Sequence, residues 1–112
     1  MDPSQTYLRV WRYRVRANSV DSFEQAYGSD GPWAQLFATG SGFLGTELVR
    51  GADGWYLTTD RWTSAERWDE WLAANGEAYA RLDRAYHELT ELEEEVLSGE
   101  SNSSRQSERP DG

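Results

Sequence analysis

The sequence predicts an α+β domain, in which an antiparallel sheet is covered by helices on one side. Segments rich in aromatic and β-branched residues, with a period of two, alternate with segments whose apolar residues recur at helical spacing. The order of these segments is β-α-β-β-α, followed by a last segment that fits either a strand or a helix. The chain has 112 residues, which is the size of a single domain.

Three strands are expected, at residues 7–16, 43–50 and 55–62. All three contain the β-branched and aromatic residues that favour strands. The first places aromatic side chains on one face and arginines on the other, and a tight turn at 51–54 joins the second strand to the third. The third strand has large apolar groups on both faces, among them Trp55 and Leu57. Both faces of the sheet should therefore be covered.

Helices are expected at residues 20–27, at 33–38 and from residue 65 onward. Pro32 suits the first position of the second helix, because a helix needs no N–H donor there. The third helix should open with a capping box formed by Thr63 and, three residues later, Glu66. Asn75-Gly76 should end this helix, and a longer one should follow.

Residues 91–97 fit two different structures. Leu92 and Val96 continue the helical spacing of the preceding segment, which favours a helix to about residue 97. Glutamates at positions 91, 93, 94 and 95 should form a solvated face in either structure. Residues 98–112 contain no apolar side chain, so we expect a disordered tail there and a folded domain at residues 6–97.

The composition excludes several classes of function. The net charge of −9 argues against a nucleic-acid partner. With no cysteine and a single histidine, His87, the chain has no disulfide, no thiol nucleophile and no multi-histidine metal site. No apolar run approaches the roughly 20 residues of a membrane span, and the N-terminus has no signal-peptide pattern. We therefore expect a cytoplasmic protein that does not interact with membranes.

Two groups of charged residues need an explanation. Asp83, His87 and Glu91 are spaced to share a helix face and could present metal ligands, but a charged outer face is the more ordinary interpretation. We therefore predict no metal site. Arg12 and Arg14 on the first strand need acidic partners, and Glu47 on the second strand is available.

The aromatic content is 13%, with six tryptophans and six tyrosines. Such a content indicates either a bulky core or a pocket for a flat ligand. Asp60 shares one face of the third strand with Thr58 and Trp62. If this face meets the helices, burial raises the pKa of Asp60 and makes it a candidate proton acceptor. Alternatively, Asp60 caps a helix or pairs with an arginine near the end of the sheet.

Two fragments of the sequence resemble a known family. Gly42-Phe43-Leu44-Gly45 leads into the second strand, and residues 56–64 (YLTTDRWTS) lead into the helix segment AERWDEW. This pattern resembles the antibiotic biosynthesis monooxygenase (ABM) domain family over residues 7–97. The resemblance implies a ferredoxin-like β-α-β-β-α-β unit, with residues 91–97 as a fourth strand. Two such units pair sheet to sheet in a dimeric α/β barrel, which would cover the sheet face left bare by the helices.

Some members of this family are cofactor-independent oxygenases that convert anthrone- or quinol-type aromatic polyketides into quinones. Others degrade haem, and others have no known activity. In the quinone-forming type the pocket lies between sheet and helices, and the matching positions here are Thr58, Trp62 and Trp68. The haem-degrading type needs a histidine where this chain has Arg81, so haem ligation is not supported.

The resemblance therefore implies a homodimeric monooxygenase that oxidises a small, flat aromatic substrate with O2 and without a metal, flavin or other cofactor. The side chains expected to bind the substrate are Trp11, Tyr13, Trp62, Trp68 and Trp71. The side chains expected to act in catalysis are Asp60 as the base, Thr58 as a hydrogen-bonding group and His87 as a second candidate base. Two alternatives remain open: a non-catalytic dimeric binding protein, and a non-oxidative cyclase or isomerase of a similar intermediate.

Overall fold

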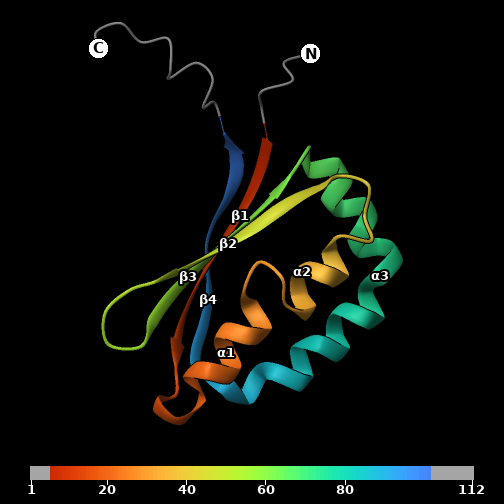
Figure 1. Ribbon diagram of the computed structural model, residues 1–112. Coiled ribbons are helices and arrows are strands. Elements are labelled where there is room, and N and C mark those ends of the chain that lie inside the picture. Colours follow the sequence, from red (N-terminus) through yellow and green to blue (C-terminus); the bar gives the residue numbers. More distant parts are fainter. Residues whose placement is uncertain (1–5, 102–112) are drawn as a thin grey trace, which may run out of the picture.

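The computed structural model describes residues 6–101. They form a four-stranded antiparallel sheet with the order β2-β3-β1-β4, and helices cover one of its faces (Figure 1). The strands are β1 (Thr6–Val15), β2 (Phe43–Arg50), β3 (Trp55–Trp62) and β4 (Thr90–Ser101). The helices are α1 (Val20–Tyr27), α2 (Pro32–Phe37) and α3 (Ala65–Tyr86), with 3-10 turns η1 (Ala17–Ser19) and η2 (His87–Leu89). The predicted α+β class and the ferredoxin-like order of elements are confirmed.

Residues 91–97, whose sequence fits either a helix or a strand, are part of strand β4. β4 pairs antiparallel with β1 from Thr6↔Ser101 to Val15↔Thr90, with two register shifts along the way. This pairing satisfies the backbone groups along one edge of β1, and it overrides the helical spacing of the apolar residues. Residues 98–101, which the sequence predicts to be part of the tail, belong to β4. The rest of the expected tail, residues 102–112, lies outside the described residues.

The third helix begins one residue later than the expected capping box. The Oγ of Ser64, not of Thr63, accepts a hydrogen bond from the backbone N–H of Arg67 at 3.1 Å. With Ser64 as the N-cap residue, Glu66 lies too early in the helix to complete a capping box. The capped start brings α3 directly onto the sheet from the end of β3.

α3 consists of two helical segments that meet at a kink at Asn75, the position where the sequence predicts the end of one helix and the start of the next. The backbone of Asn75 is non-helical (φ −124°, ψ 20°), and its Nδ2 donates a hydrogen bond to the carbonyl of Trp71 at 2.9 Å. A short polar side chain that bonds to nearby backbone in this way competes with regular helix geometry. The result is a kink that divides the 22 residues of α3 into two helical segments.

The core between sheet and helices is mostly aromatic. Trp62, at the end of β3, is fully buried. Its ring centroid lies 5.2 Å from that of Phe43, 5.5 Å from Trp68, 5.8 Å from Trp71 and 5.9 Å from Phe37. Most of these pairs are edge-to-face, the arrangement that aromatic quadrupoles favour. This cluster fixes α2 and α3 on the inner face of the sheet.

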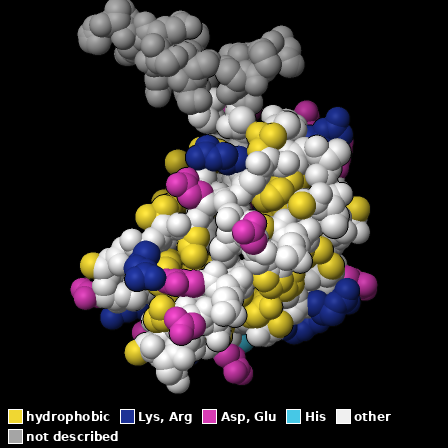
Figure 2. Space-filling model, viewed as in Figure 1, with side chains coloured by type: hydrophobic (Ala, Val, Ile, Leu, Met, Phe, Trp, Pro, Cys, Tyr) yellow, Lys and Arg dark blue, Asp and Glu magenta, His cyan; other side chains and the backbone are white. Residues whose placement is uncertain are grey.

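No described helix covers the outer face of the sheet (Figure 1). Leu44, Val49, Leu92 and Leu97 are exposed among the described residues, and Leu57 is only half-buried. Figure 2 shows hydrophobic side chains reaching the surface on the strand side of the molecule, among acidic and basic ones. An apolar surface of this kind is typical of an interface.

The arginines of the outer face have partners other than the one we expected. Arg12 pairs with Glu94 on β4 at 3.1 Å, and Arg14 approaches Glu91 at 3.9 Å. Glu47, the predicted partner, instead lies 3.7 Å from Arg61. The reason is the strand order, since β1 has β4 as a neighbour and β3 separates it from β2.

Within residues 6–101, no helix is long and apolar enough to cross a membrane.

Candidate functional site

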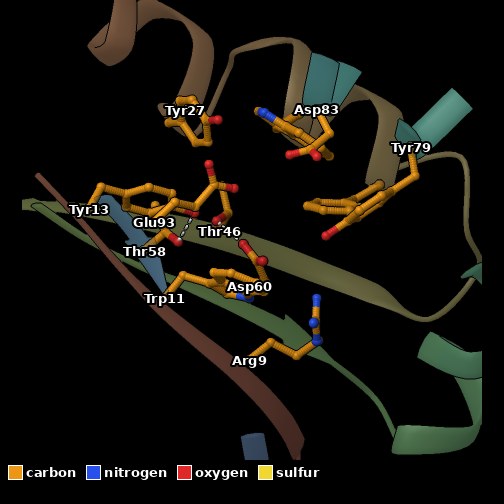
Figure 3. A pocket seen from close by; sticks show the side chains of 12 residues that line it. Arg9, Trp11, Tyr13, Tyr27, Thr46, Thr58, Asp60, Tyr79, Asp83 and Glu93 are labelled. Carbon is orange, nitrogen blue, oxygen red and sulfur yellow. Dashed lines mark hydrogen bonds between the residues drawn. The ribbon is translucent and has the colours of Figure 1, made fainter. Parts of the chain in front are cut away.

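A small cavity lies between the inner face of the sheet and the helices, lined by residues from every strand and from all three helices (Figure 3). Its volume is about 30 Å³, which is room for about one or two water molecules. Aromatic rings make up much of the wall, and one arginine and three carboxyl side chains line the space: Arg9, Asp60, Asp83 and Glu93.

Asp60 is the most unusual ionisable group in this wall. It points inward from β3 and is only 7% exposed. The hydroxyl of Thr46, on the neighbouring strand β2, donates a hydrogen bond to Asp60 Oδ1 at 2.5 Å. Burial raises the pKa of Asp60 to about 6, although the Thr46 hydrogen bond and the charge of Arg9 act in the opposite direction. A carboxyl group with this pKa can exchange a proton near neutral pH.

Tyr13 and Thr58 form a hydrogen-bonded pair beside Asp60. Their hydroxyl oxygens are 3.2 Å apart, and both residues are buried. Burial raises the pKa of Tyr13, although its hydrogen bond with Thr58 opposes the shift. The pair therefore presents neutral hydroxyl groups that can donate to, or accept from, a bound ligand.

Arg9 contributes the positive charge of the cavity wall. Its guanidinium carbon lies 3.9 Å from the ring centroid of Trp68 and 5.7 Å from that of Trp11. The side chain is buried, and no carboxylate among residues 6–101 forms an ion pair with it within 4.0 Å. A planar guanidinium stacked on an indole ring is stabilised by cation–π attraction.

The other end of the cavity contains buried polar atoms without partners. Tyr27 Oη on α1 and Trp33 Nε1 on α2 are fully enclosed, and neither has a hydrogen-bond partner. Burial raises the pKa of Tyr27 and the negative charges of Glu93 and Asp83 reinforce the shift, while the neighbouring Trp33 N–H opposes it. In Figure 3, the Tyr27 hydroxyl and the carboxyl groups of Asp83 and Glu93 face a common gap. Orphaned polar groups of this kind are costly unless a water or a ligand satisfies them.

The structure brings together some of the predicted site residues and separates others. Trp11, Tyr13, Thr58 and Asp60 all line the cavity. The residues predicted at the site that do not line it are Trp62, Trp68, Trp71 and His87. The three tryptophans belong to the core cluster, although Trp68 borders the site through its contact with Arg9. The imidazole is exposed in η2.

Several lining residues were not predicted as site residues: Arg9, Tyr27, Trp33, Phe37, Thr46, Tyr79, Asp83 and Glu93. Arg9 could have been found, because it shares the inner face of β1 with Trp11 and Tyr13 by simple alternation. Glu93 faces the site because it pairs with Tyr13 in the β1–β4 register. That position could not be inferred while residues 91–97 fitted a helix as well as a strand.

The three residues considered as metal ligands do not share a helix face. Asp83 is on α3, His87 is in η2 and Glu91 is on β4. Within the part of the chain that the structure describes, no cluster of three or more His, Cys, Asp or Glu side chains could hold a metal ion.

Solved structures with this fold include oxygenases. A mutant of SnoaB, a cofactor-independent oxygenase from Streptomyces nogalater, matches with a TM-score of 0.58 and 21% identity, over 88% of this chain and 91% of SnoaB. A candidate antibiotic biosynthesis monooxygenase from Nitrosomonas europaea matches with a TM-score of 0.62 and 11% identity, over 84% and 88%. PA3566 from Pseudomonas aeruginosa matches with a TM-score of 0.59 and 11% identity, over 90% and 96%.

No protein-family model matches the chain, and no curated protein sequence matches it either. The similar structures confirm the predicted resemblance at the level of the fold: the chain has the architecture of the antibiotic biosynthesis monooxygenase domain. Because fold does not imply function, the chemistry must be argued from the cavity itself.

Proposed function

We propose that the chain is a cofactor-independent monooxygenase that oxidises a flat anthrone- or quinol-type aromatic substrate with O2. The observation that carries the proposal is the buried carboxyl group of Asp60, set in an aromatic-walled cavity and poised to accept a proton near neutral pH. A proton acceptor in a buried aromatic site suits a substrate that becomes reactive on deprotonation.

The chemistry needs little more than deprotonation and confinement. With an anthrone as the substrate, Asp60 takes a proton from the CH2 group of the central ring, and the resulting electron-rich anion transfers an electron to O2. Recombination forms a carbon–oxygen bond, and the peroxide then loses water. One oxygen atom of O2 becomes the new carbonyl oxygen, and the other leaves in the water molecule with two hydrogens from the substrate. Tyr13 and Thr58 are placed to hold an oxygen substituent of the ring system while this happens.

The cavity has to enlarge before such a substrate can bind. Its volume of about 30 Å³ is far below the roughly 300–1,000 Å³ of typical ligand pockets. Arg9 is the longest flexible side chain in the wall, and its planar head group occupies the face of Trp68 on which an aromatic ring could stack. We propose that substrate binding moves Arg9 off this ring, so that Trp11 and Trp68 border the bound substrate.

We further propose that the chain works as a homodimer, paired through the outer face of the sheet. The exposed apolar side chains of that face support this, because such a surface is an association liability in an isolated domain. Pairing two copies by a two-fold axis turns the surface into a second core. The dimer leaves the cavity on the opposite side of each sheet accessible.

Oxygen uptake is the experiment that tests the proposed reaction. The protein is mixed with 9-anthrone in an oxygen electrode, and quinone formation is followed by absorbance. Uptake of one O2 per quinone formed supports the monooxygenase. Product formation without O2 uptake would instead indicate a cyclase or isomerase, and binding without turnover would indicate a binding protein. Either of these results contradicts the proposal.

A further inference from the structure

Asp83 and Glu93 form a second ionisable pair in the cavity, separate from Asp60. Asp83 comes from α3 and Glu93 from β4, and their carboxyl groups face the same gap (Figure 3). Glu93 is exposed to solvent and Asp83 is partly exposed, so the gap opens to the surface at this end. Within residues 6–101, neither carboxyl group forms an ion pair within 4.0 Å. Desolvation raises the pKa of Glu93, and the negative charge of Asp83 and a side-chain hydrogen bond with it reinforce the shift, while the charge of His87 opposes it.

A second, independent feature at this end of the cavity indicates a missing ligand. The Tyr27 hydroxyl is fully enclosed and has no hydrogen-bond partner, and the residue is only 6% exposed. Figure 3 shows this hydroxyl directed toward the gap that Asp83 and Glu93 face. A tyrosine hydroxyl can accept a hydrogen bond as well as donate one, so the three groups together offer acceptors to a single donor-rich partner.

The charged side chains that line the cavity indicate the charge of the missing ligand. The cavity has three carboxyl groups and one cationic side chain, Arg9, which lies toward Asp60. Asp83 and Glu93 are therefore left without a counter-ion inside the cavity. The rings of Tyr27 and Trp33 line the same space, and aromatic faces attract cations. Carboxylates and aromatic faces together favour a positively charged group and disfavour an anionic one.

We propose that this end of the cavity binds an organic ammonium group, so that the ligand of the site is a flat aromatic molecule with a basic amine. The ammonium donates hydrogen bonds to Asp83, Glu93 and the Tyr27 hydroxyl, while the aromatic part extends toward Asp60. This inference rests on the proposed function only in that the same cavity holds the substrate.

The test compares three probes that share one ring system but differ in charge. Isothermal titration calorimetry at pH 7.5 measures binding of 1-naphthylmethylamine, 1-naphthalenemethanol and 1-naphthoate to the full 112-residue protein. We expect the amine to bind about tenfold more tightly than the alcohol, and the carboxylate to bind most weakly. Binding is measured without turnover, so a failure of oxygen uptake leaves this result unaffected.

Variants assign the preference to particular carboxyl groups. Glu93→Gln and Asp83→Asn should each weaken binding of the amine about fivefold or more, and should change the affinity for the alcohol by no more than about twofold. The matched controls Glu100→Gln and Asp69→Asn, both at exposed positions, should change neither. Equal binding of amine and alcohol, tighter binding of the carboxylate, or no binding of any probe would overturn the inference. Loss of the amine preference in Asp60→Asn alone would overturn it too, because the ammonium would then lie at Asp60.

Discussion

At the scale of single residues, Asp60 combines a cost to stability with a use in chemistry. The residue is 7% exposed, and its carboxyl group has the Thr46 hydroxyl as a direct hydrogen-bond donor. Desolvation penalises the charged form, and the pKa rises from 3.8 to about 6. The raised pKa that makes Asp60 useful as a base near neutral pH therefore also lowers the stability of the folded protein.

Replacing Asp60 should make the protein more stable at neutral pH. The folded protein binds the carboxyl proton more tightly than the unfolded chain, so Asp60 favours folding below about pH 4. This contribution is lost as the pH rises through about 6, and the ionised group then costs on the order of 3 kcal/mol. Asp60→Asn should therefore raise the thermal midpoint at pH 7.5 and flatten its pH dependence between pH 4 and 6. A lower midpoint at pH 7.5, with the slope unchanged relative to the exposed control Asp69→Asn, would contradict this.

Alternation along strands explains which site residues the sequence could predict. Asp60 and Thr58 were found because β3 places them on one face with Trp62, and the structure places both in the cavity wall. The same alternation on β1 includes Arg9, but a buried arginine is rare enough that composition alone does not suggest it. Trp62 itself lies in the core, because its large ring fills the space between β3, α2 and α3.

At the scale of elements, the start of α3 depends on a close approach to the start of β2. A Cβ atom at Gly42 would lie 2.5 Å from the Cβ of Arg67 and 2.9 Å from the Oγ1 of Thr63. The backbone N–H of Thr63 also donates a hydrogen bond to the carbonyl of Gly42 at 2.8 Å. These contacts are too tight for any side chain, and they fix the point at which the helix leaves the sheet.

Two glycine substitutions should therefore have opposite effects on stability. Gly42→Ala should destabilise the fold by about 1–3 kcal/mol, because the added methyl group forces the backbone of β2 and α3 apart. Gly76→Ala should stabilise it by about 0.5–1 kcal/mol, since nothing lies within 4 Å of the new Cβ and alanine favours the helix. Urea unfolding measures both. Equal effects of the two substitutions would show that α3 does not depend on the contact at Gly42.

β4 shows where local sequence patterns fail to determine an element. Leu92 and Val96 keep a helical spacing, yet residues 90–101 pair with the whole of β1. The pairing partner is more than seventy positions away in the chain, as in Arg12 and Glu94. Spacing within a short segment contains no information about that partner, so only the resemblance to the family predicted the strand.

At the scale of the whole molecule, the uncovered outer face of the sheet predicts self-association. Exposed leucines and valines from β2 and β4 lie on either side of β1 and β3, which contribute Leu57 at the centre. A two-fold pairing of this face should bury more than about 1,200 Å². The wild-type protein should therefore have a light-scattering mass near twice 12.8 kDa.

Leu57→Glu should disrupt this dimer, because it places a charge in the middle of an apolar contact. The matched control Ala73→Glu, at an exposed position of α3, should leave the mass of the dimer unchanged. A monomeric mass for the wild-type protein at high concentration would contradict the dimer. So would a Leu57→Glu variant that stays folded and dimeric.

In the proposed reaction, Asp60 accepts the proton whose loss makes the substrate reactive toward O2. The most direct measurement is the pH dependence of kcat/KM for oxygen uptake with 9-anthrone, for the wild-type protein and for Asp60→Asn. The wild-type rate should rise as Asp60 ionises, with an inflection near pH 6. The variant should be slower by about a hundredfold or more and should lack that inflection. A variant that retains both the wild-type rate and the inflection would show that the proton goes elsewhere.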